Sequence, residues 1–161
     1  MNPRLVILLA FGMGVVGGLR SMTAPAVVAW AGRLGWISLS GSPLAFMSSR
    51  SAAGIFTLAA LGEFVADLLP GVPARTSAFP LAARIVVGFL SGACVAVAGG
   101  LSLWVGGVVG AAGAIAGAAG GYKARTGLVR TLRVRDALIA IPEDFIAVGL
   151  GLALVSRLGA F

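Results

Sequence analysis

Long apolar runs dominate this chain, and charged residues, glycine and proline gather in the short stretches between them. An apolar run of about 18 or more residues predicts a membrane-spanning helix, because about 20 helical residues cross a hydrocarbon core of ~30 Å. We therefore predict an all-α integral membrane protein of about five transmembrane helices, folded as one domain over residues 1–161. The predicted helices cover residues 5–31, 52–69, 79–99, 101–122 and 137–156.

The first run is too long for one straight span, since a helix over residues 5–31 would extend about 40 Å. Pro25 lacks a backbone donor, and Gly17 and Gly18 weaken the helix just before Arg20. These residues predict a kinked or broken helix, with the interruption within residues 17–25. A cleaved secretory signal is the alternative interpretation of this segment.

Composition supports a membrane protein. Apolar residues make up 59% of the chain and charged residues only 11%, against roughly a quarter in soluble domains. The formal charge of +7 does not indicate nucleic-acid binding, because the arginines flank apolar runs instead of forming an aromatic-studded basic face. Histidine is absent and Cys94 is the only cysteine, so we expect no metal site, no cofactor and no catalytic activity.

The basic residues also predict an orientation. With five spans, the N-terminus, Arg75 and the segment 123–135 share one side, and Arg33, Arg50 and Arg157 share the other. The first side carries more positive charge, so the positive-inside tendency places the N-terminus in the cytoplasm and the C-terminus outside. We expect a multi-pass protein of the bacterial cytoplasmic (inner) membrane.

A ten-residue pattern, GxxGGx[RK]xxT, occurs at residues 14–23 and again at 117–126. A weaker echo relates Glu63-Phe64-Val65-Ala66 to Asp144-Phe145-Ile146-Ala147. Together they predict an inverted internal repeat of helices 1–2 and 4–5, with units at about 5–70 and 101–156 and a connector helix at about 79–99. Such repeats are typical of transporters with a site near the midplane. The alternative is that glycine-rich membrane helices resemble one another by composition alone.

Charged residues lie inside or at the edges of the apolar runs, where an unpaired charge costs about 2.5 to 3.5 kcal/mol on insertion scales. Arg84 is one of them. We predict that Arg20 pairs with Glu63 or Asp67, and that Lys123 or Arg125 pairs with Glu143 or Asp144. Ion pairs that only lock helices together are the structural alternative. The candidate solute or ion pathway comprises Arg20, Ser21, Thr23, Glu63, Asp67, Lys123, Arg125, Thr126, Glu143 and Asp144.

Glycines recur at a spacing of four residues, which permits close approach between membrane helices. We predict that they pack the fourth helix against the first, with a homodimer interface as the alternative. The glycines concerned are Gly14, Gly17, Gly18, Gly106, Gly110, Gly113, Gly117 and Gly121.

The strings GLRSMTAPA at residues 18–26, GEFVADLLP at 62–70 and PART at 73–76 resemble a family of small bacterial membrane proteins known as domain of unknown function 4126. The resemblance covers most of the chain and implies a membrane location, but no substrate.

The leading hypothesis is therefore a small inverted-repeat transporter or channel for a solute or ion. Its expected partners are the lipid bilayer, the small solute or ion and a second copy of the chain, and no nucleic acid. A non-catalytic membrane assembly subunit is the first alternative. Lipid scrambling or an intramembrane lipid-modifying activity is the second.

Overall fold

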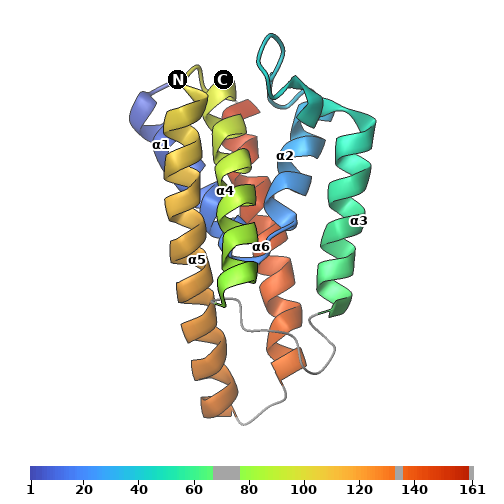
Figure 1. Cartoon of the computed structure of the whole chain (residues 1–161), viewed down its shortest axis with the longest axis vertical. Coiled ribbons are helices and arrows are strands. Elements are labelled where there is room, and N and C mark those ends of the chain that lie inside the picture. The colour runs from blue at the N-terminus through green and yellow to red at the C-terminus, as the bar shows by residue number, and fades with distance from the viewer. Residues whose placement is uncertain (67–76, 133–135, 160–161) are drawn as a thin grey trace.

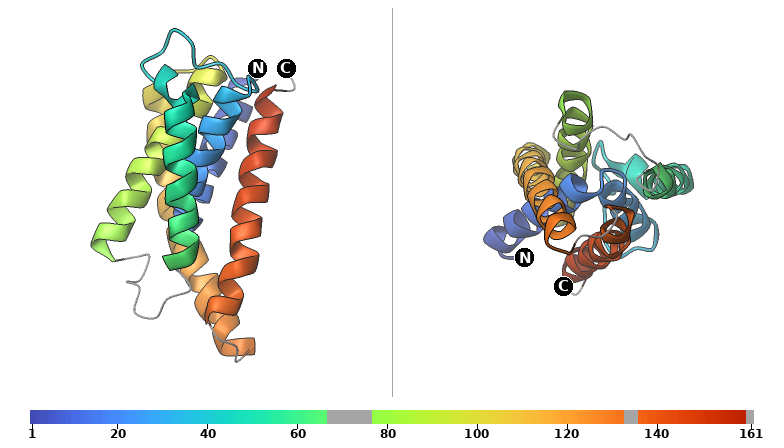
Figure 2. Two further views of the ribbon diagram at one scale, coloured as in Figure 1. Left: turned by 90° about the vertical axis from the view of Figure 1, so that its right-hand side faces the viewer. Right: turned by 90° about the horizontal axis from the view of Figure 1, so that it is seen from below.

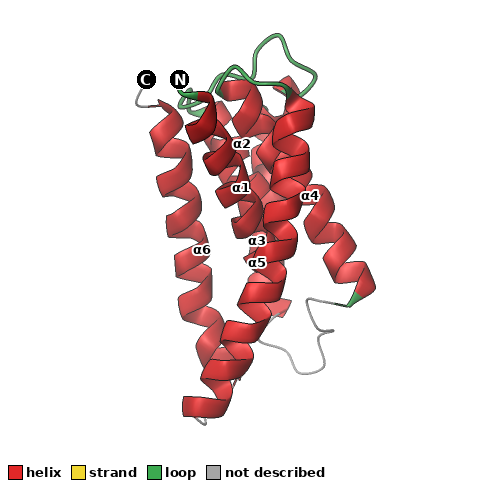
Figure 3. Ribbon diagram, turned by 90° about the vertical axis from the view of Figure 1, so that its left-hand side faces the viewer, coloured by secondary structure: helices red, strands yellow, loops and turns green. Residues whose placement is uncertain are grey.

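The computed structural model describes residues 1–66, 77–132 and 136–159. Within these ranges the secondary structure is helical and contains no strand (Figure 3). The elements, in chain order, are α1 (Pro3–Leu19), α2 (Thr23–Arg33), the short 3-10 helix η1 (Ala45–Ser48), α3 (Arg50–Ala66), α4 (Ala78–Ala98), α5 (Leu103–Leu132) and α6 (Asp136–Gly159). The predicted all-α fold is confirmed.

The first apolar run forms two helices that run in opposite directions (Figure 1). A methyl group built on Gly12 of α1 would meet Leu154 of α6, and Arg20 reaches back to Asp144, so α1 runs antiparallel to α6. In α2 the order is reversed, because Val27 lies at Gly151 and Trp36, after the helix, lies at Gly159. The predicted helix is therefore broken, but it does not form one span: α1 enters the bundle and α2 returns to the end from which α1 started.

Glycines bring α1, α4 and α5 into close contact. A methyl group on Gly110 would lie less than 3.0 Å from backbone atoms of Gly88 and Gly92 in α4, and one on Gly14 would lie equally close to Gly110. Because backbone approaches backbone at these positions, a side chain at Gly110 would force the helices apart. The predicted packing of residues 101–122 against the first helix is confirmed.

The inverted repeat is not confirmed. Gly14 faces Gly110, and Gly18 faces Ala114 and Gly117, so the contacts advance in the same direction along both helices. Helices α1 and α5 are therefore parallel, whereas an inverted repeat requires them to be antiparallel.

The helix hairpin also changes the expected topology. The two termini lie at the same end of the bundle (Figure 1), not at opposite ends. Lys123, Arg125 and Arg130 lie in the part of α5 that points away from the N-terminus. These basic residues do not share a side with the N-terminus, so they do not indicate that the N-terminus is cytoplasmic.

Among the described residues, α4 and α5 are long and apolar enough to cross a membrane, and α1 is a shorter apolar helix.

Candidate functional site

The centre of the candidate site is the break between α1 and α2. Arg20 has an extended backbone (φ −137°, ψ 108°), and α2 begins at Thr23. Pro25 lies in the first turn of α2, where a missing N–H costs no hydrogen bond, while the same proline would interrupt a continued α1. The predicted interruption within residues 17–25 is confirmed.

Glu63 of α3 caps the start of α2. Its carboxylate accepts hydrogen bonds from the backbone N–H of Ser21, from the Ser21 hydroxyl and from the backbone N–H of Met22, each at 2.9 Å. A helix N-terminus carries unpaired N–H groups and a partial positive charge, so a carboxylate is well suited to this position. The break is thus stabilised by a side chain from another helix.

Arg84 of α4 caps the end of α1. Its Nε donates to the carbonyl oxygen of Gly18 at 3.1 Å, and one terminal nitrogen donates to Pro80 at 3.2 Å. The other terminal nitrogen pairs with the Glu63 carboxylate at 3.5 Å. A guanidinium at a helix C-terminus complements the free carbonyl groups there. In the sequence Arg84 is a charge in an apolar run, and this role is not apparent there because its partner is a backbone carbonyl.

Arg20 links the break to α6. Its side chain is fully buried and forms an ion pair with Asp144, while the guanidinium carbon lies 5.6 Å from the centre of the Phe64 ring. The prediction placed the partner of Arg20 within the first repeat unit, at residue 63 or 67. A described ion pair of Arg20 crosses to the last helix, because the hairpin brings α1 and α2 against α6; Asp67, the other predicted partner, lies outside the described residues.

These four charged residues lie deep in the bundle. At 1.5 Å per residue, Glu63 lies about 20 Å along α3 from Arg50, and Asp144 lies about 22 Å along α6 from Gly159. Both distances are measured from the end of the bundle that carries the termini. We call Arg20, Glu63, Arg84 and Asp144 the break cluster; two cations face two carboxylates within it.

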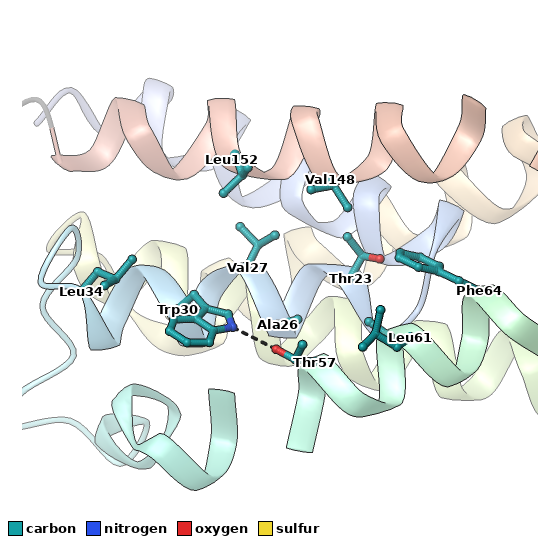
Figure 4. Close-up of a pocket in the computed structure, with 11 residues that line it drawn as sticks. Thr23, Ala26, Val27, Trp30, Leu34, Thr57, Leu61, Phe64, Val148 and Leu152 are labelled. Carbon is teal, nitrogen blue, oxygen red and sulfur yellow. Dashed lines mark hydrogen bonds between the residues drawn. The ribbon is translucent and has the colours of Figure 1, made fainter. Parts of the chain in front are cut away.

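Thr23 adds a polar atom beside the cluster. The residue is only 2% exposed, and its hydroxyl oxygen has no hydrogen-bond partner. It lines the inner end of an apolar groove between α2, α3 and α6, close to Phe64 (Figure 4). A buried hydroxyl without a partner loses hydration and gains nothing in return, so it is a natural place for a polar group of a ligand.

The second copy of the pattern lies inside the continuous helix α5 and not at a helix break. Arg125 pairs with Glu143 at 3.6 Å, as predicted, and Thr126 donates to the carbonyl of Tyr122 at 2.7 Å. Lys123 is exposed. The structure thus groups Arg20, Ser21, Thr23, Glu63 and Asp144 around the break, and Arg125 pairs with the residue next to Asp144. Asp67 lies outside the described residues. No group of three or more potential metal ligands occurs within the described ranges.

The comparison with protein families gives one match. The family model described as "Domain of unknown function (DUF4126)" matches residues 7–158, which is nearly the whole chain. No curated protein and no solved structure matches the chain.

Proposed function

We propose that this chain, which belongs to the DUF4126 family, is a small membrane transporter or channel for a solute or ion and acts at the break cluster. Its place is the bacterial cytoplasmic membrane. The α1–α2 hairpin lies within the bilayer, and the apolar α4 and α5 pack against it. The break, with Glu63 at the start of α2, is the observation that carries the proposal.

Interrupted helices support transport because their free ends can bind ions inside a membrane. Irregular backbone at membrane depth is tolerated where protein or water satisfies it, and half-helix N-termini bind anionic groups in many transporters. Here Glu63 fills the position that an external anion would occupy at α2. Release of Glu63 from Ser21 and Met22 would open that position to a substrate.

The residues of the break cluster have distinct roles in this proposal. Glu63 and Asp144 respond to protons or cations, since neutralising either carboxylate weakens its ion pair. Arg20 and Arg84 are the cations left to hold an anionic substrate. The unpartnered hydroxyl of Thr23 supplies a neutral hydrogen bond beside them.

The assembly-subunit hypothesis requires the charged side chains to face a partner protein and not the interior of the bundle. A subunit that pairs with another membrane protein through intramembrane charges presents those charges on its outer face. Arg20 and Arg84 are at least nine-tenths buried, and their described carboxylate partners lie within the same chain. This inward orientation favours transport over the assembly role.

Flux in proteoliposomes tests the proposal. Purified protein is reconstituted, and pH- and voltage-sensitive dyes report movement of a panel of ions and small anions. Glu63→Gln and Asp144→Asn are compared with wild type and with Arg130→Gln, which changes an exposed residue of α5. We expect flux in wild type and Arg130→Gln and its loss in the two cluster variants. No flux of any tested species through folded, inserted wild-type protein would count against the proposal.

A further inference from the structure

An apolar groove runs along the outside of the bundle between α3 and α6, with α2 as its floor. Figure 2 shows α2 lying between these two helices. The groove has a volume of about 350 Å³, and Val27, Leu61, Phe64, Val148 and Leu152 are among its lining residues. Neighbouring helices that enclose a lateral groove of this kind leave room for a chain-like apolar molecule.

The polar groups in the middle of the groove are already paired. Trp30 of α2 donates its indole N–H to the hydroxyl of Thr57 of α3 at 2.9 Å (Figure 4), and that hydroxyl donates to the carbonyl of Ala53 at 2.7 Å. An apolar ligand would therefore leave no polar group of Trp30 or Thr57 without a hydrogen-bond partner.

Three arginines lie at the end of the bundle toward which the groove runs from Thr23 to Leu34, one near the end of each helix that forms the groove. Arg33 is the last residue of α2, Arg50 is the first residue of α3, and Arg157 lies in the last turn of α6. All three are exposed. No Asp or Glu occurs in residues 1–62 or 145–161, so no acidic side chain from these segments neutralises them. An anionic group is the complement of this end.

The length of the groove fits one leaflet of a bilayer. Helix α2, which forms the floor, has 11 residues and is about 16 Å long. This is about half of a hydrocarbon core of ~30 Å. A molecule with an anionic headgroup at the arginines would extend an apolar tail of one leaflet's length along the groove toward its inner end.

We propose that this groove binds an anionic phospholipid, with the phosphate at Arg33, Arg50 and Arg157 and one acyl chain between α3 and α6. The arginines satisfy the charge of the phosphate, as basic residues near a membrane surface do for anionic lipids. The acyl chain covers the side chains that the groove exposes. This inference does not depend on the transport proposal, because it uses none of the four residues of the break cluster.

Fluorescence quenching by lipids with brominated acyl chains tests this proposal. A Trp36→Phe, Trp104→Phe variant of the full chain leaves Trp30, which lines the groove, as the only tryptophan. The protein is reconstituted in phosphatidylcholine bilayers that contain increasing fractions of brominated phosphatidylglycerol or, separately, brominated phosphatidylcholine. We expect quenching of Trp30 at a lower mole fraction of brominated phosphatidylglycerol than of the zwitterionic lipid.

Two further variants separate the headgroup site from the groove. Replacing all three arginines by Gln is expected to weaken phosphatidylglycerol binding about 100-fold, equivalent to about 3 kcal/mol. The double variant Arg4→Gln, Arg130→Gln changes exposed arginines on other helices and is the control. Ala60→Phe, which fills the groove wall, is expected to reduce quenching by both lipids.

Three results would overturn the proposal. They are equal quenching by the two lipids, an unchanged preference in the triple variant, and a dimer in which a second copy of the chain covers Trp30 and keeps both lipids away. Thermal unfolding of each variant verifies that it is folded before binding is measured.

Discussion

Removing the Glu63 side chain tests whether this carboxylate holds the broken helix together. In Glu63→Ala the backbone N–H groups of Ser21 and Met22 lose the acceptor that both share. A buried N–H left without a partner costs about 1–3 kcal/mol, and these two are partly buried, so the expected loss in the free energy of unfolding is at most about 2–6 kcal/mol. Arg84 keeps two carbonyl acceptors, at Gly18 and Pro80, and adds less to this cost.

This loss is a large part of a typical stability of about 5–15 kcal/mol. For a chain of this length it corresponds to a decrease in melting temperature of roughly 4 to 24 °C. Thermal unfolding of the purified protein in detergent, followed by the fluorescence of its tryptophans, measures it. Glu63→Gln keeps one acceptor oxygen where the carboxylate offers one to each N–H group, so only one of the two hydrogen bonds can remain and we expect about half the loss.

Arg130→Ala is the control for this measurement, because Arg130 is exposed on α5. A surface substitution of this kind usually changes stability by less than about 0.5 kcal/mol. If Glu63→Ala melts at the temperature of wild type, the cap does not stabilise the break, and the account of how α2 begins fails.

Three further predictions concern packing, topology and the unpartnered hydroxyl. Gly110→Ala should destabilise the protein in the same thermal assay, because its methyl group would meet the backbone of α4. Gly120→Ala is the control: no atom lies within 4 Å of its methyl group, so it should be neutral or stabilising by up to about 1 kcal/mol. Equal effects of the two substitutions would refute close packing at Gly110. Reporter fusions at the two termini should place both on one side of the membrane, and opposite sides would contradict the hairpin. Thr23→Val should keep or raise thermal stability, because the hydroxyl it removes has no partner, and should lower flux; a loss of stability would reveal a hydrogen bond at that hydroxyl.

The sequence predicted the position of the break but not the direction of the chain after it. Pro25 and the glycines before Arg20 carry local information, because backbone donors and helix propensity act within a few residues. Direction is not local. An apolar run of 27 residues is equally compatible with one tilted span and with two short antiparallel helices. Contacts with α6, more than 100 residues downstream, distinguish them.

The ten-residue pattern does occur twice in the sequence, but the inverted repeat inferred from it is not confirmed by the structure. Both copies of the pattern end in threonine. In the first copy, Pro25 lies two residues after that threonine; in the second copy, Leu128 occupies the equivalent position. Without the proline, α5 continues to Leu132. The same ten-residue pattern therefore lies at a break in one place and within a helix in the other.

The buried charges were recognised from the cost of placing them in lipid, and one of the predicted pairs, Arg125 with Glu143, is present. The roles of Glu63 and Arg84 were not predictable in this way. Both cap backbone groups, and the sequence does not indicate which backbone groups a fold leaves unpaired.

The caps of the break are synthesised long after the backbone that they satisfy. Glu63 follows Ser21 by 42 residues, and Arg84 follows Gly18 by 66. At a synthesis rate of about 5–20 residues per second, the hairpin waits roughly 2–13 s for these two residues and longer for Asp144. Until then its inner ends have no carboxylate or guanidinium partner within the chain. The N-terminal hairpin is therefore completed late in biogenesis, and its final position in the membrane depends on the helices made after it.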